Sequence, residues 1–355
     1  MINYTIFLLK CEELTACLNI VAVVITGCIV KNQKQKGHLL GWLGLLVLVV
    51  VGLSIFLNRE WLYDFYRGTI YRPTDEMIRI RSDLALTDRG EFLFNASQPE
   101  LNEAAEFNSY CRNGASEVAV LGCYIGNSIH VYNITDKRLA GIRELTSAHE
   151  LLHANWARMS QEERIALVEP LTRAFEANQD LLKDELSTYE ADQKQEELYV
   201  RAGTEIADLP EALEKHYSEI FKDQDKIVRF YNNYIGVFKT LATEMEGLKT
   251  EMEAISTEIE SKIAIYDQKS KELDAAVDDF NSCARTINCF GTEYEFNARR
   301  TELMAEQTVL QTMYDEINAL VETYNKKVKI YNADVTETKK LNTIINSSTK
   351  PRAIE

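Results

Sequence analysis

The amino-acid sequence predicts a mainly α-helical protein with a small β element: an N-terminal transmembrane helical hairpin (residues 1–60), an α+β domain (61–220) and a C-terminal antiparallel coiled coil (221–345). Three observations predict it: two uncharged apolar runs near the start, β-branched runs beside a helical pattern in the middle, and seven-residue apolar spacing towards the end. With 39 Lys and Arg against 55 Asp and Glu, the net charge is −16. This charge, without a basic cluster, argues against a nucleic-acid partner.

The N-terminal hairpin is predicted from two segments without charged residues, Leu14–Val30 and Leu39–Leu57. A bilayer core takes about 20 apolar residues per helix, so both segments are candidate membrane spans. Three lysines in the connection 31–36 place it in the cytoplasm by the positive-inside rule, and everything after residue 57 is then extracellular. A signal-anchor followed by a buried core helix is the alternative. Aromatic residues typical of an outer membrane interface follow: Trp61, Tyr63, Phe65 and Tyr66.

Four cysteines outside the first apolar region form two close pairs, Cys111 with Cys123 and Cys283 with Cys289. Each pair brackets an expected chain reversal, so local disulfides in an oxidising compartment are a natural prediction. Free buried thiols are the alternative, because pairing cannot be read from spacing alone.

Residues 58 to about 110, which include the start of the middle domain, read as mixed helix and loop. Residues 117–127 and 128–135 are rich in β-branched and aromatic side chains and are divided by Gly126-Asn127-Ser128, which predicts a β-hairpin. Apolar residues three or four apart then predict a helix over residues 143–159.

This helix contains the sequence His149-Glu150-Leu-Leu-His153. Residues four apart lie on one helix face, so the two imidazoles can bind one zinc ion. Glu150 is then placed to take a proton from the attacking water and to deliver it to the leaving amine. A helix with two surface histidines and a glutamate is the alternative without function.

The motif helix resembles the active-site helix of the zincin metallopeptidases, and the preceding strands resemble their substrate-binding edge. The lack of a third histidine and downstream glycine argues against the metzincin branch, and the gluzincin branch, typified by thermolysin, is the better match. Over about residues 90–300 the chain also resembles uncharacterised membrane-anchored bacterial HExxH proteins, which supply no assigned substrate. The resemblance implies a zincin-like fold, a Zn²⁺ cofactor and a third ligand from a glutamate on a later helix.

Two glutamates are candidates for this third ligand. Glu197 is favoured because its position, with Gly-Thr a few residues later, resembles the gluzincin glutamate. Glu205, at the end of the same predicted helix, remains the alternative. Val200 and Arg201 depart from the family pattern, which favours Ser or Ala and then Asp, and this puts the usual supporting carboxylate in doubt.

The remaining histidines carry weaker predictions. His216-Tyr217 could donate a hydrogen bond to a tetrahedral oxyanion, although a surface histidine beside a core tyrosine is the more common arrangement. His130, in a strand, and His38, at a membrane boundary, are predicted to be structural.

The C-terminal region shows apolar residues every seven positions in two segments, separated by a stretch that contains Cys283, Cys289 and Gly291. This pattern predicts two long helices that reverse at the cysteines into an antiparallel hairpin. The last residues, 346–355, are predicted to be a disordered tail. The principal heptad positions are Tyr231, Phe238, Met245, Met252, Ile259, Tyr266, Leu273 and Phe280, then Leu303, Leu310, Ile317, Tyr324 and Tyr331.

Together these features predict a zinc metallopeptidase of the cell membrane that hydrolyses peptide bonds, with Glu150 as general base, His149, His153 and Glu197 as zinc ligands, and extracellular C-terminal domains. Its expected partners are a peptide or protein substrate, the membrane through two spans, and a protein bound by the coiled coil. The alternative is a catalytically inactive adhesion or spacer protein of the cell surface that uses its coiled-coil arm for interaction.

Overall fold

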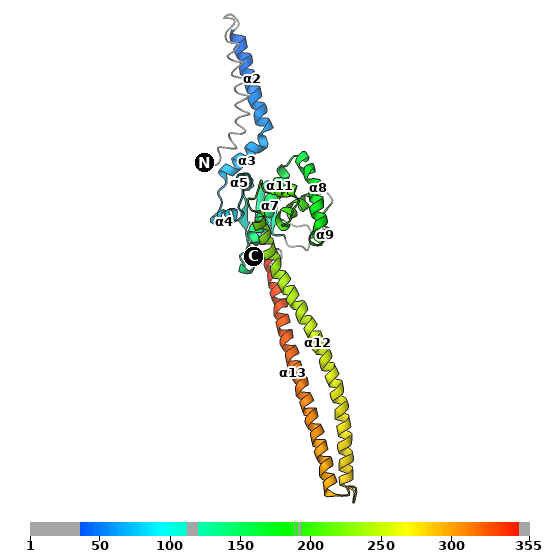
Figure 1. Cartoon of the computed structure of the whole chain (residues 1–355). Helices are drawn as coiled ribbons and strands as arrows, with labels where there is room; N and C mark the ends of the chain where they lie inside the picture. Colours follow the sequence, from blue (N-terminus) through cyan, green and yellow to red (C-terminus); the bar gives the residue numbers. More distant parts are fainter. Residues whose placement is uncertain (1–35, 112–119, 188, 191–192, 348–355) are drawn as a thin grey trace. The chain divides into compact units, whose positions relative to one another are not determined.

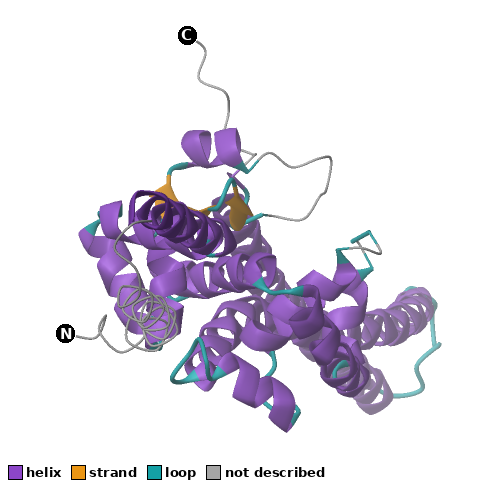
Figure 2. Cartoon of the chain, turned by 90° about the horizontal axis from the view of Figure 1, so that it is seen from above, coloured by secondary structure: helices purple, strands orange, loops and turns teal. Residues whose placement is uncertain are grey.

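The computed structural model describes residues 36–111, 120–187, 189–190 and 193–347, and these are mostly helical with one small sheet (Figures 1 and 2). The chain divides into two compact units: one contains the described residues up to Tyr234 and resumes at Ile345, and the other is Ile235–Ile344. The prediction of a mainly α-helical protein with a small β element is therefore confirmed.

The first described helices are α2 (Lys36–Leu57) and α3 (Arg59–Ile70) (Figure 1). Within the described part of the chain, no single helix combines the length and the apolar composition needed to cross a bilayer. Trp42–Leu57 and Arg59–Ile70 meet both requirements as a pair, with a bend of 69° between them. The first predicted span, Leu14–Val30, lies outside the described residues, so the two-span hairpin stays a prediction.

The remaining helices of the first unit are short, and threonine or serine side chains cap several of their N-termini. Thr74 and Thr87 each accept a hydrogen bond from a backbone N–H three residues later, and Ser160 forms a reciprocal capping box with Glu163. In chain order these helices are α4 (Asp75–Asp83), α5 (Asp88–Ala96), α6 (Ala104–Tyr110), the 3-10 turn η1 (Lys137–Leu139), α7 (Ile142–Arg158), α8 (Gln161–Ala177), α9 (Gln179–Leu186), α10 (Lys194–Glu205) and α11 (Glu211–Tyr217).

The sheet has three strands in the order β1-β3-β2, with bounds Glu100–Asn102 for β1, Gly122–Ile125 for β2 and Ser128–Tyr132 for β3. The predicted hairpin is confirmed: β2 and β3 pair antiparallel around Gly126 and Asn127, whose φ angles of 58° and 64° suit these residue types. Strand β1, which pairs parallel with β3, was not predicted. Cys111 and Cys123 form the expected disulfide, which ties β2 to the residue after α6.

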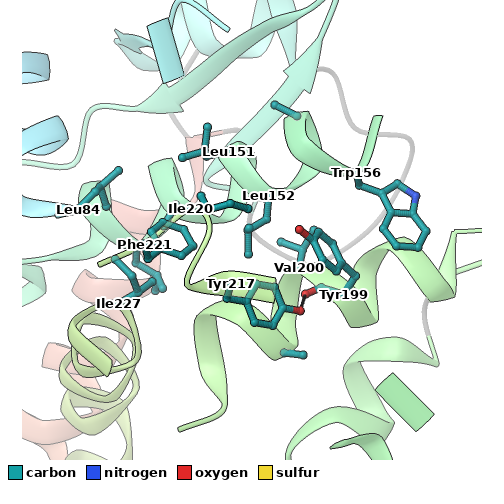
Figure 3. Packing of buried hydrophobic residues seen from close by; sticks show 14 of the residues in the cluster. Leu84, Leu151, Leu152, Trp156, Tyr199, Val200, Tyr217, Ile220, Phe221 and Ile227 are labelled. Atoms are coloured by element: carbon teal, nitrogen blue, oxygen red, sulfur yellow. Dashed lines mark hydrogen bonds between the residues drawn. The ribbon is translucent and has the colours of Figure 1, made fainter. Parts of the chain in front are cut away.

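A large part of the first unit's core lies where α7 packs against α10, which is contacted in turn by Tyr217 of α11 (Figure 3). Leu152 of α7 and Val200 of α10 both belong to this core, and Tyr217 of α11 donates a hydrogen bond of 2.6 Å to the carbonyl oxygen of Tyr199. Gly203 allows this close approach, because a Cβ atom there would lie 2.5 Å from Leu152 Cδ1 and 2.7 Å from Tyr217 Cε1. The two helices that carry the candidate site are therefore held by direct core packing.

We expect Gly203→Ala to destabilise the first unit by about 1–2 kcal/mol, because overpacking a rigid core costs about 1–3 kcal/mol while the gain in helix propensity offsets up to about 1 kcal/mol. Thermal unfolding followed by tryptophan fluorescence should show a lower Tm. Gly236→Ala is the matched control, since a Cβ at Gly236 meets nothing within 4 Å. Equal Tm changes in the two variants would contradict the close-packing interpretation.

The second unit consists of most of α12 (Gln224–Ala284) and α13 (Glu293–Ile345), which pack together as two long helices. Their pairing is antiparallel: Leu273 packs against Leu303 and Leu310, and Lys262 forms an ion pair of 2.7 Å with Glu316. The predicted Cys283–Cys289 disulfide closes the connection between the helices. The heptad pattern thus predicted the two helices correctly, and the segment with Cys283, Cys289 and Gly291 predicted their antiparallel direction. Of the predicted disordered tail, residues from 348 on lie outside the described part, while Ser347 accepts a hydrogen bond from Asn108 in the first unit.

Candidate metal centre

The histidines of the motif share one side of α7, while its opposite side forms part of the core. Leu151 and Leu152, between the two histidines, are fully buried, whereas His149 and His153 are half-buried with ring centroids 5.1 Å apart. The spacing of four residues places both rings on one face, as the sequence predicts. The two imidazoles therefore lie close enough, on one face of α7, to bind the same ion.

Helix α10 adds a carboxylate at this point. The Oε1 atom of Glu197 lies 3.9 Å from Nε2 of His149, and its Oε2 atom lies 3.6 Å from Nε2 of His153. One ligand atom from each of these residues falls within 4.8 Å of the other two, so the group could hold a metal ion. Glu197 is only 3 % exposed, which is unusual for a carboxylate unless it is paired or coordinated.

Glu205, the alternative third ligand, lies elsewhere on α10. Its Oε1 atom accepts a hydrogen bond of 3.0 Å from Arg201, and it is not part of the group formed by the histidines and Glu197. Arg201 also donates a 2.6 Å hydrogen bond to Glu197 Oε1. The geometry thus favours Glu197, and the arginine that departs from the gluzincin pattern acts as a hydrogen-bond donor to this candidate ligand.

A second carboxylate orients His153. Nδ1 of His153 lies 2.8 Å from Oε1 of Glu196, which leaves Nε2 on the side of Glu197. A carboxylate bonded to the far nitrogen of a histidine fixes the ring and its tautomer in many metal sites. A carboxylate therefore contacts one of the two histidines, although Arg201 stands where the gluzincin pattern favours an acid. The hydroxyl of Tyr189 also hydrogen-bonds to Glu197.

The pKa values of the two histidines are shifted in opposite directions. Burial lowers the pKa of His149 to about 3, despite the opposing charge of Glu197, so this imidazole is neutral at pH 7. Burial also lowers the pKa of His153, but hydrogen bonds to Glu196 and Glu197 and the charge of Glu150 outweigh it and raise the pKa to about 10. Without a metal, His153 therefore holds a proton at pH 7. A metal ion must displace that proton, so metal affinity should rise with pH below about 10.

Glu150 lies beside this group without being part of it. It is 5 % exposed, and burial raises its pKa to about 7, with Glu196 and Glu197 adding to the increase. Gly122 of β2 leaves room for the carboxylate, because a Cβ atom there would lie 2.7 Å from Glu150 Oε1. The backbone of Tyr124 in the same strand hydrogen-bonds to Glu150. A carboxylate with a pKa near 7 is suited to move protons in both directions at neutral pH.

These residues line an open pocket of about 310 Å³. Three groups of residues line it: Gly122, Cys123 and Tyr124 of β2, the strand wall; His149, Glu150 and His153 of α7; and Tyr189, Gln193, Glu196 and Glu197. The pocket thus joins the candidate metal ligands to a strand at the edge of the sheet.

The other predicted histidine sites lie outside this pocket. The His216 ring lies against Tyr199, with Nε2 3.1 Å from the tyrosine hydroxyl, and Tyr217 is fully buried, so neither reaches the metal group. His130 is buried, bonds to Asn102 and stacks on Tyr110, which agrees with a structural role.

Sequence reasoning missed Tyr189, Gln193 and Glu196 as pocket residues. Glu196 carried a weak signal, because it directly precedes the favoured ligand. Tyr189 and Gln193 lie between α9 and α10, and no periodicity or motif marks them.

Comparisons of the chain with protein-family models, with curated proteins and with solved structures find no match. The function is therefore inferred from the chemistry of this centre.

Proposed function

We propose that this protein is a membrane-anchored zinc metallopeptidase that hydrolyses peptide bonds. The observation that supports it most directly is the convergence of His149 and His153 from α7 with Glu197 from α10, beside a buried Glu150. Two imidazole nitrogens and one carboxylate oxygen form a ligand set that catalytic zinc uses, with one position left for water or substrate.

The surrounding residues fit a zinc ion. His149 is neutral at pH 7, as a ligand must be, and Glu196 holds the ring of His153 in a fixed orientation. Arg201 and Tyr189 fix the carboxylate of Glu197 in the same way. When bound, zinc supplies a Lewis acid that polarises the scissile carbonyl and lowers the pKa of the attacking water.

The residues of the chain provide the proton transfers and the binding surface. Glu150 takes the proton from the attacking water and then delivers it to the leaving amine nitrogen. Strand β2 is at one edge of the described sheet, so an extended peptide can add to it through backbone hydrogen bonds. Gly122 and Tyr124 of that strand lie directly against Glu150, which brings a bound peptide bond close to the base.

Metal content gives the first test. The full-length protein, purified in detergent, should contain about one zinc ion per chain. His149→Ala or His153→Ala should lose it, because the one remaining imidazole and the Glu197 carboxylate bind zinc only weakly. Elemental analysis after desalting measures this ratio. His216→Ala is the matched control, since His216 lies outside the pocket, and it should keep its zinc. If either motif variant retained its zinc, the assignment of His149 and His153 as ligands would be wrong.

The adhesion or spacer function is the second candidate, and the long antiparallel helices α12 and α13 are the observation that favours it. It predicts a wild-type protein that lacks stoichiometric zinc, or that binds zinc and hydrolyses no peptide in a library. The same zinc measurement, followed by mass spectrometry of a peptide library, separates the two functions.

A further inference from the structure

Helix α3 buries an acidic side chain and exposes most of its apolar ones. A surface helix normally buries its apolar face and exposes its polar one. In α3 the acidic Asp64 is 9 % exposed, while apolar and aromatic side chains on the other side are 38–59 % exposed. Those exposed side chains are Leu62, Tyr63, Phe65, Tyr66 and Ile70.

The inner face of α3 is fixed to the domain by charge-assisted hydrogen bonds. Arg158, in the last turn of α7, donates two hydrogen bonds of 2.8 and 2.9 Å to the carboxylate of Asp64. Arg67 donates to the carbonyl oxygens of Ala96 and Asn127, at 2.8 and 2.9 Å. Paired bonds of this kind are geometrically specific, so α3 is a fixed part of the domain.

The same contacts connect α3 to the candidate site. Arg158 also donates a hydrogen bond of 2.8 Å to the hydroxyl of Tyr124, which lines the pocket. A single arginine thus contacts both Asp64 of α3 and the strand wall of the pocket.

Helix α3 follows a helix that is apolar from Trp42 to its last residue, Leu57. In α2 the exposed side chains include Trp42, Leu48 and Leu57, each about 70 % exposed, and Trp42–Leu57 contains no charged residue. The chain then bends by 69° between α2 and α3. Tyrosine and phenylalanine are typical of the boundary between hydrocarbon and headgroups, and helices with one apolar face lie along that boundary.

We infer that α3 lies in the interfacial layer of a phospholipid bilayer, with Leu62, Tyr66 and Ile70 towards the lipid and Asp64 and Arg67 towards the domain. The occupant of the exposed face is lipid, because α3 directly follows the exposed apolar stretch Trp42–Leu57 of α2 in the chain and the two together have the length and composition of a membrane segment. This inference rests on the membrane anchor in the proposed function and is independent of the zinc chemistry. It makes α3 the element that links the membrane surface, through Asp64 and Arg158, to a strand that lines the pocket.

Depth-dependent fluorescence quenching tests this inference. Two of the three tryptophans of the full chain are replaced, by Trp42→Phe and Trp61→Phe, and Trp156 stays in every variant as a constant background signal. A single tryptophan is then added at Tyr66, Leu48 or Ile165. Each variant is reconstituted in phosphatidylcholine vesicles, either without brominated lipid or with lipid brominated near the headgroup or near the chain end. Ile165 of α8 is the matched control, because it is 62 % exposed against 59 % for Tyr66.

We expect Tyr66→Trp to lose fluorescence most with bromine near the headgroup and Leu48→Trp to lose it most with bromine near the chain end. Ile165→Trp should lose no more than the background. Ile70→Trp, on the same face, should behave like Tyr66→Trp. It replaces Tyr66→Trp in the experiment if that variant fails to fold. Quenching of Leu48→Trp alone would overturn the interfacial position of α3 and leave the anchor intact. Absence of quenching at both positions would overturn the anchor as well, while zinc content would still report separately on the metal centre.

Discussion

Glu150→Gln is expected to keep its fold and its zinc and to lose peptide hydrolysis by about a hundredfold or more, the range typical of a lost general base. Glu150 is buried beside the metal group without belonging to it, and its pKa of about 7 suits proton transfer. Glutamine has the same length and can still accept a hydrogen bond from the backbone of Tyr124. It cannot take a proton from water, so only the chemical step should fail.

The measurement compares kcat/KM on a cleaved peptide with zinc content, for wild type, Glu150→Gln and Glu162→Gln. Glu162 is an exposed glutamate in the first turn of α8, and its replacement should change neither quantity. Loss of zinc from Glu150→Gln would show that this carboxylate supports the metal site. Full activity in the same variant would leave the proposed peptidase without a base.

Local patterns predicted the elements near the site because their causes are local. Helix α7 runs over Ile142–Arg158, against a predicted 143–159, since its apolar spacing is regular over four turns. The β2–β3 hairpin forms where Gly126 and Asn127 supply the required left-handed backbone. His149 and His153 are four residues apart on a helix, so they share one face whatever the tertiary contacts are.

Features that depend on distant contacts were missed or left open. Strand β1 has three residues, too few for a period, and it exists because β3 pairs with it. The contact of Asp64 with Arg158 joins residues on α3 and α7, and neither residue stands in a recognisable motif. The choice between Glu197 and Glu205 depended on the packing of α10 against α7, to which sequence spacing contributes only indirectly.

Arg201 stands where the gluzincin pattern favours an acid, and its contacts could not be predicted from the sequence. From the sequence alone, its replacement of the usual acid counted against a working metal site. In the structure it bonds to both Glu197 and Glu205, and Glu196 provides the carboxylate that His153 needs.

Glu197→Gln is expected to weaken zinc binding by about a hundredfold or more, because loss of a coordinating carboxylate exceeds the 10–100-fold typical of contacts around the ligands. Glu197 is buried between the two histidines, and an amide there has no negative charge to balance the metal ion. Competition with a chromophoric chelator measures the change in Kd.

Glu205→Gln is a closely matched control for this variant. Both glutamates lie on α10, both are buried, and both accept a hydrogen bond from Arg201, but only Glu197 lies beside the histidines. Glu205→Gln should therefore keep the zinc affinity of the wild type, with at most a small effect through Arg201. Should Glu205→Gln lose zinc while Glu197→Gln retains it, the third ligand would be Glu205, and α10 would have to turn relative to α7 when the metal binds. Because the two substitutions remove the same charge from the same helix, a difference between them isolates coordination from general electrostatics.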